Sequence, residues 1–459
     1  MKKIFLLLVV VVGVLMLLPI FGNKVVQDEL NNRLEVLRSY GVEVTQDDKG
    51  SNYFTKKLHY QFLVKDEDKF IKYIQQFSEQ QLPPYTNAMI GGVLVGADVS
   101  YSNFSFSDKI SIEIYPLSFS KKIMDDLKRE DESFYEYIKS LLKNKTLLYH
   151  INYNILGGEF DGYIKNIKEH YNLKNGIKIS MDISDAIFSG EGPLIAPSML
   201  KSDIKHIGFN ATRDREKFSL SVDDFSTTSN FQSQSTYATT LKLKKFEWFI
   251  KGTKRSDVLM KSSDIYLNAS SNVQNEKAEF YVKSSFENLK IKTPLSSFIA
   301  DDYSFISAIN GMDKKSFERL RILISDSRIN QSKRLQNKIL KESINLLSKG
   351  LRFDVADFSL DRFSLKGRKD IKGFKIKGNL VLKEDNNLKG GNNIPIFEIL
   401  KDITVDAKLQ FSNGLMAFIN EEIPLSNAVE DFAKKDGDNV VFKVKFKDSK
   451  LSINGKSLK

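Results

Sequence analysis

The residues whose chemistry could build a catalytic or metal site are four histidines and three groups of acids. The histidines are His59, His150, His170 and His206, and no two of them have the spacing that places metal ligands together on one helix or strand. The chain also has no GxSxG sequence, the turn that presents a nucleophilic serine in many hydrolases. We therefore predict no catalytic, cofactor-binding or metal-binding residue, and a protein that is not an enzyme.

The grouped acids are Asp223-Asp224, Asp301-Asp302 and the DGD sequence at 436–438. Neighbouring side chains on a strand point to opposite faces, so an adjacent pair does not hold two carboxylates together for acid–base chemistry. We predict turns and helix starts at these positions.

Two glycine-containing segments have the composition of loops. The sequence GGEFDG at 157–162 lacks the strand-then-helix setting of a phosphate-binding loop, and it predicts a β-turn or bulge. The sequence SGEGPLIAPS at 189–198 differs in composition from the rest of the chain, and it is the loop where we expect a contact.

The overall composition narrows the class of protein. The chain has 459 residues, 69 basic and 58 acidic, for a formal charge of +11, which favours anionic partners such as lipid headgroups, glycans or nucleic acid. It has no cysteine, which excludes disulfides, thiolate catalysis, cysteine metal sites and a lipid-modified cysteine.

The N-terminus predicts a membrane anchor. Lys2 and Lys3 precede an uncharged run at 4–21, which as a helix spans roughly 27 Å, close to the thickness of a bilayer core. A cleaved signal peptide is the alternative, but the following PIFGNKVV has no small-x-small site. We predict a cytoplasmic stub at 1–3, a transmembrane anchor at 4–21 and a periplasmic remainder, hence a single-pass protein of the bacterial inner membrane that meets no nucleic acid.

A helix is predicted directly after the anchor. Val26, Leu30, Leu34 and Leu37 share one helical face, and Gly41 stands where a helix C-terminus requires it. Three roles remain open for this helix, namely a stalk, a dimer contact, or a layer packed on a sheet.

The remaining chain divides by its hydrophobic period. Residues 22–145 mix helical and strand patterns, 146–295 are rich in strands, 296–349 are helical, and 350–459 are strand-rich with a closing hairpin. The hairpin shows the strand pattern well, because three apolar residues alternate with three lysines: Phe442, Val444 and Phe446 with Lys443, Lys445 and Lys447. The predicted fold class is α+β: an N-terminal transmembrane helix, then a large twisted antiparallel β-sheet with helices packed on its apolar face.

The order of these features resembles the YdgA-like family of bacterial inner-membrane and periplasmic proteins of unknown function. The likeness in organisation covers nearly the whole chain, and its sharpest part is the closing LSINGKSL, where Leu451, Ile453, Asn454 and Gly455 match the family's final pattern. It implies a periplasmic domain that can self-associate, and it supplies no catalytic residue. The architecture is also similar, at the level of the fold alone, to AsmA-like envelope proteins, whose apolar groove is linked to lipid traffic.

These observations lead to one expected function and two alternatives. We expect a non-enzymatic periplasmic envelope protein, anchored in the inner membrane, that handles or scaffolds apolar envelope components such as phospholipid. The first alternative is an interaction module that assembles other envelope proteins or copies of itself, and the second is an envelope hydrolase. No cofactor is expected.

Overall fold

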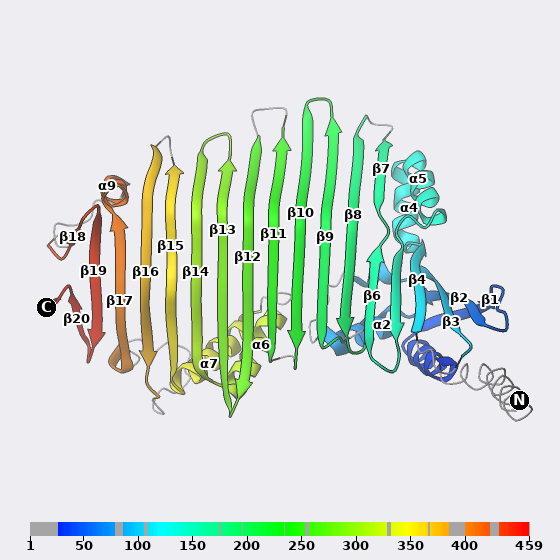
Figure 1. The fold of residues 1–459 in the computed structure, drawn as a ribbon, viewed down its shortest axis with the longest axis horizontal. Coiled ribbons are helices and arrows are strands. Elements are labelled where there is room, and N and C mark those ends of the chain that lie inside the picture. Colours follow the sequence, from blue (N-terminus) through cyan, green and yellow to red (C-terminus); the bar gives the residue numbers. More distant parts are fainter. Residues whose placement is uncertain are drawn as a thin grey trace, which may run out of the picture. The chain divides into compact units, whose positions relative to one another are not determined.

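A computed structural model of the chain describes residues 26–78, 86–104, 109–173, 176–194, 196–233, 235–252, 257–327, 332–365, 368–384, 400–422 and 431–458. Strands account for 59% of the structure and helices for 23%, and the paired strands are antiparallel (Figure 1). The chain divides into two compact units, residues 1–205 and 206–459, and strand β9 (Met199–Arg213) contains the boundary.

The first unit begins with a helix at 26–39 and continues with eight strands and four further helices. In chain order these are β1 (Val42–Asp48), β2 (Thr55–Val64), α2 (Glu67–Ser78), α3 (Thr86–Ile90), β3 (Leu94–Ser102), β4 (Lys109–Ser118), α4 (Lys121–Glu130), α5 (Glu132–Lys143), β5 (Tyr149–Asn154), β6 (Glu159–Ile164), β7 (Ile167–Asn172) and β8 (Lys178–Glu191). Strands β1 to β6 pair in sequence order, and β6 and β7 both pair with β8.

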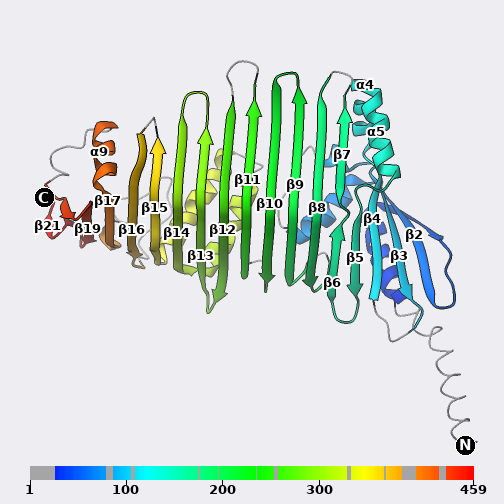
Figure 2. The ribbon, with the colours of Figure 1, turned by 45° about the horizontal axis from the view of Figure 1, so that its top comes forward.

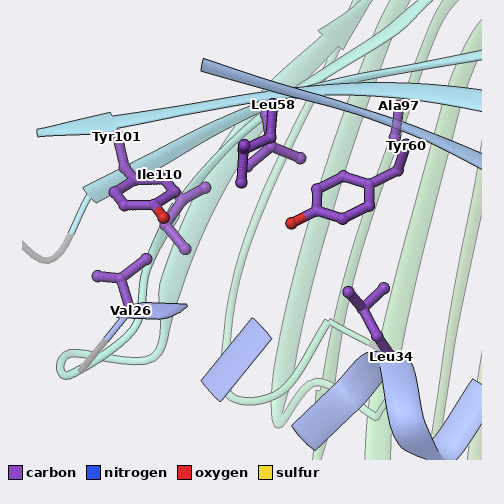
Figure 3. Close-up of a cluster of buried hydrophobic side chains, with 8 residues drawn as sticks. Val26, Leu34, Leu58, Tyr60, Ala97, Tyr101 and Ile110 are labelled. Atoms are coloured by element: carbon purple, nitrogen blue, oxygen red, sulfur yellow. The ribbon is translucent and has the colours of Figure 1, made fainter. Parts of the chain in front are cut away.

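The helix at 26–39 packs on strands β2 to β4 and forms the core of the first unit. Val26 and Leu34 are buried in one cluster with Leu58 and Tyr60 of β2, and Figure 3 shows Leu34 below Tyr60 and Val26 below Ile110. Gly41 ends the segment with a φ of +82°, a conformation that glycine adopts without strain. Of the three roles left open for this helix, packing on the sheet is confirmed.

The second unit is a sheet of long hairpins with three described helices. Its elements are β10 (Glu216–Phe231), β11 (Tyr237–Lys251), β12 (Val258–Gln274), β13 (Lys277–Lys292), β14 (Ser297–Asp313), α6 (Lys314–Ser327), α7 (Lys333–Ser348), β15 (Leu351–Leu365), β16 (Arg368–Leu382), β17 (Ile403–Ser412), α9 (Asn413–Glu422), β18 (Lys434–Asp436), β19 (Asn439–Lys447), β20 (Lys450–Ile453) and β21 (Lys456–Ser457). Strands β10 to β17 pair in sequence order, and β19 follows β17.

Local sequence explains where the elements begin and end. Asn275 and Glu276 both have positive φ in the two-residue turn between β12 and β13, the backbone that fits the twist of a tight hairpin. Asp131 caps α5 by accepting hydrogen bonds from the backbone N–H groups of Ser133 and Phe134. The closing hairpin is confirmed, because Asp448 and Ser449 form its turn and Phe442 is buried while the neighbouring lysines are exposed.

The predicted transmembrane helix requires a correction. No helix in the described part of the chain is long and apolar enough to cross a membrane. The longest of these described helices, α7, has 16 residues and is amphipathic, whereas a span needs about 20 apolar residues. The predicted anchor at 4–21 lies outside the described residues. The part of the chain that the structure describes is therefore a large antiparallel sheet with packed helices, and it does not show the predicted transmembrane helix.

The helical region predicted at 296–349 begins later in the structure. Residues 297–313 form strand β14, and the helices start at Lys314. The strand escaped notice because its apolar alternation changes parity: Phe298 and Ala300 are followed by Tyr303 and Phe305. The three-residue step from Ala300 to Tyr303 interrupts the strand alternation and resembles the spacing of apolar residues on a helix.

Candidate functional site

The one-residue shift in the alternation of apolar residues seen in β14 also occurs in other strands of the second unit. Asp224, Asp264 and Asp302 lie inside β10, β12 and β14 with φ values of 51°, 49° and 53°. Asp tolerates this left-handed conformation better than most residues. Our interpretation of Asp223-Asp224 and Asp301-Asp302 was wrong, because both pairs lie inside strands and form neither turns nor helix starts. The DGD sequence is a turn as predicted, with Gly437 at a φ of +58°.

The ladder of paired residues is interrupted at the same level on successive strands, by two positions between β12 and β13 and by one position between the other pairs from β10 to β16. On β10 and β11, for example, Asp223 pairs with Lys245 and Phe225 with Leu243, so that Asp224 faces Lys244 without a ladder pair. We call this line the crease, and it comprises Asp224, Lys244, Asp264, Glu287, Asp302, Asp361 and Gly373.

The crease keeps apolar residues on one face of the sheet. Phe286 and Leu289 flank it on β13 and are three residues apart, a spacing that would put them on opposite faces of a regular strand. Both pack in one cluster with Ala300 and Phe363. The apolar residues on both sides of the crease therefore lie on the same face of the sheet and form one continuous apolar surface. Along the sequence, the alternation of apolar and polar residues shifts by one position at the crease.

We call the part of this surface on β10 to β12 the open face. Cross-strand neighbours define it, since Leu220 pairs with Trp248 and Trp248 with Met260, while Phe225 pairs with Leu243 and Leu243 with Ile265. Its apolar residues are Phe218, Leu220, Val222, Phe225, Leu241, Leu243, Phe246, Trp248, Ile250, Met260, Ile265 and Leu267. The residues between them on the strands, such as Ser221, Lys242 and Lys261, are mostly polar and point to the other side.

No hydrophobic side chain among the described residues of 206–273 is buried. The buried residues in this stretch are small, namely Gly208, Ser229, Ser235, Ser262 and Ser271. The same apolar surface is covered toward one end of the strands, where the buried Ser235 hydroxyl, in the turn between β10 and β11, donates to Glu318 of α6 at 3.3 Å. Helices α6 and α7 lie together over one side of the strands in Figures 1 and 2, and they bury Ala278 and Met312, while Leu415 of α9 packs against Phe363.

The open face and the covered part belong to one surface. Leu267 and Val273 alternate on the same side of β12, and Val273 packs against the cluster beneath α6 and α7, whereas Leu267 is 37% exposed. A large apolar patch of this kind rarely stays uncovered without a partner, because exposed apolar area is costly in water.

The open face offers few free hydrogen-bonding groups. The buried Ser262 hydroxyl donates to the Asn288 carbonyl at 2.9 Å and the Ser271 hydroxyl to the Ser235 carbonyl at 2.8 Å. Strands β11 and β12 are paired on both sides, so their backbone groups are satisfied within the sheet. The chemistry that this surface can perform is the sequestration of hydrocarbon.

The first unit contains a polar cluster that sequence reasoning missed. Asp98 Oδ1 lies 2.6 Å from His59 Nδ1, and Asp98 Oδ2 accepts hydrogen bonds from Lys145 at 2.6 Å and Tyr115 at 2.9 Å. Burial opposes the ionisation of Asp98, but the hydrogen bonds from Lys145, His59 and Tyr115 outweigh it and lower its pKa to about 2. The alternation that places His59, Asp98 and Tyr115 on one face was the available signal, but their pairing across β2 to β4 is a property of the fold.

The other histidines do not converge. His206 Nδ1 lies 2.5 Å from Asp223 Oδ1, the ring of His150 stacks on Tyr163, and His170 is exposed on β7. No group of three or more His, Asp or Glu side chains within the described ranges is placed to hold a metal ion.

The two glycine-containing segments lie close together. Gly157 and Gly158 form the turn between β5 and β6, as predicted, and the backbone N–H of Gly192 donates to the Gly158 carbonyl at 2.5 Å. Ser189, Gly190 and Glu191 line a pocket of about 620 Å³ in the first unit. The contact role expected for residues 189–198 stays a prediction.

No known protein family, curated protein or solved structure matches this chain. The resemblances to YdgA-like and AsmA-like proteins therefore stay predictions.

Proposed function

We propose that the second unit binds the acyl chains of lipid on its open face, and that this binding is the protein's function without a catalytic step. The observation that carries the proposal is the absence of any buried hydrophobic side chain in the described residues of 206–273, beside a covered continuation of the same surface. A sheet that buries its apolar face with helices at one place and leaves it open at another has room for an apolar ligand there.

The polar groups favour hydrocarbon over a protein partner. Protein interfaces carry about one hydrogen bond per 100–200 Å² of contact. The hydroxyls of Ser262 and Ser271 are bonded within the chain, and the interior strands have no unpaired edge to offer. An acyl chain needs no hydrogen bonds, and each buried CH₂ contributes about 0.8 kcal/mol.

The only tryptophan of the chain provides the assay. Trp248 lies on the open face between Leu220 and Met260, so an acyl chain placed there removes water from the indole ring. The full-length protein is titrated with a single-chain, zwitterionic phosphocholine lipid below its aggregation concentration, and its tryptophan emission is followed. We expect a saturable shift of the emission to shorter wavelength.

A matched pair of variants tests the location. Leu243→Glu places a charge on the open face, and Lys242→Glu places the same charge on the next residue, which is exposed on the opposite face. We expect Leu243→Glu to abolish the shift and Lys242→Glu to preserve it, with melting curves recorded to show that both variants are folded. No emission shift in the unmodified protein, or equal loss in both folded variants, overturns the proposal.

A further inference from the structure

The first unit has a second surface with ligand-binding chemistry. A pocket of about 790 Å³ lies between strands β2 and β4 and the hairpin of α4 and α5. His59, Tyr115 and Lys145 of the polar cluster line it from the sheet side, and Lys139 and Lys143 line it from α5. The pocket is separate from the open face and comprises residues of the first unit alone.

The charges around this pocket do not balance. Four lysines line it, Lys49, Lys139, Lys143 and Lys145, together with one acid, Glu136, which pairs with Lys139 at 3.1 Å. A second carboxylate, that of Asp98, contacts the pocket lysines and binds Lys145 at 2.6 Å. Two positive charges thus remain in excess around the pocket.

Asp98 and Tyr115 hold the ammonium group of Lys145 at the base of the pocket. Lys145 Nζ lies 3.9 Å from the centroid of the Tyr115 ring, and Asp98 holds it from the other side. Lys49 Nζ stands 3.8 Å from the second oxygen of the same carboxylate. Asp98 attracts both ammonium groups and is itself held by His59 and Tyr115, so Lys145 loses little conformational entropy when an anion binds there.

We propose that this pocket binds a phosphate group. A phosphate monoester carries a charge of about −1.5 to −2 at neutral pH and three acceptor oxygens, which matches the two excess charges and the converging lysine donors better than a carboxylate does. The phosphate comes from a small phosphorylated molecule or from an anionic lipid headgroup, which share this chemistry.

The test measures the affinity of the full-length protein for inorganic phosphate by calorimetry. The double variant Lys49→Gln with Lys143→Gln removes two cations of the pocket, and we expect the Kd to rise about tenfold or more, the loss typical of hydrogen bonds to charged groups. The control is Lys121→Gln with Lys122→Gln, which removes the same charge from exposed positions on α4 outside the pocket lining. We expect this control to change the Kd by less than about twofold.

A second arm identifies the source of the phosphate. The protein is sedimented with vesicles of phosphatidylglycerol or of phosphatidylcholine. Binding of inorganic phosphate without preference between the vesicles assigns the pocket to free phosphate esters. Preference for phosphatidylglycerol that is lost in the Lys49/Lys143 variant assigns it to a headgroup. Absence of both signals overturns the proposal, as does an equal effect of the two double variants, which would show general attraction to a basic surface.

Discussion

Two phenylalanines on the same apolar surface, Phe363 and Phe246, differ in how far the structure covers them. Phe363 is 7% exposed, lies in a cluster with Ala300 and Leu415, and has its ring centroid 6.0 Å from that of Phe418 on α9. Phe246 is half-buried, and its cross-strand partners are Val222 and Ser262. The same substitution to alanine should therefore have different effects at the two positions.

The magnitudes follow from what each ring loses. Phe363→Ala removes a buried ring and leaves a cavity beneath α9, at a cost of about 3–5 kcal/mol in the free energy of unfolding. Phe246→Ala removes a ring that water already reaches, so we expect a cost of about 1 kcal/mol. Thermal melts followed by circular dichroism measure this difference, which we expect to exceed about 6 °C in melting temperature.

Lipid binding should rank the variants in the opposite order. Phe246→Ala should weaken the titration observed through Trp248, while Phe363→Ala, measured at a temperature where it is folded, should leave it unchanged. Equal and large losses of stability in both variants would show that the face on β11 is covered like that on β15. Unchanged lipid affinity in Phe246→Ala would refute the open face as the binding surface.

Three further predictions test the crease and the polar cluster. The pKa of Asp98 is lowered from 3.8 to about 2, so its ionised form stabilises the folded protein by about 2 kcal/mol above pH 4, and this contribution is lost as the pH falls toward 2. Asp98→Asn should therefore destabilise the protein by about 2 kcal/mol at pH 7. Thermal melts between pH 4 and pH 2 should show the difference between the variant and the unmodified protein becoming smaller. Asp302→Val should cost about 1–2 kcal/mol because a β-branched residue is strained at its φ of 53°, whereas Asp302→Gly should be nearly neutral, and equal melting temperatures for both variants would contradict this reason. Gly373→Ala should lower the melting temperature clearly, since a Cβ there would stand 1.9 Å from the Leu360 carbonyl oxygen, and a stable alanine variant would show that β15 and β16 separate without cost.

Some features of this protein were predictable because they depend on neighbouring residues. The alternation of Phe442 and Phe446 with lysines predicted a strand that is apolar on one side, and the terminal hairpin has that form. The four-residue spacing of Val26, Leu30 and Leu34 predicted a helix with one buried face. In both cases the period of the backbone fixes which side chains share a face.

Other features were hidden because one residue changes the period. Asp302 turns the backbone into the left-handed region in the middle of β14, and the apolar series continues one position out of phase. The sequence at 297–313 therefore suggested a helix. No exact tandem repeat is present, yet Asp224, Asp264 and Asp302 recur at intervals of 40 and 38 residues, which correspond to one hairpin each.

The sequence by itself determined that the strands have one apolar and one polar side, since side-chain direction is set by the local backbone. Only the tertiary structure decided which part of the apolar side is covered, because α6, α7 and α9 reach it through contacts between distant parts of the chain. The same holds for the polar cluster, in which Asp98 meets His59 across 39 residues and Lys145 across 47. Contacts of that range depend on the register of several strands at once, and no local pattern in the sequence specifies that register.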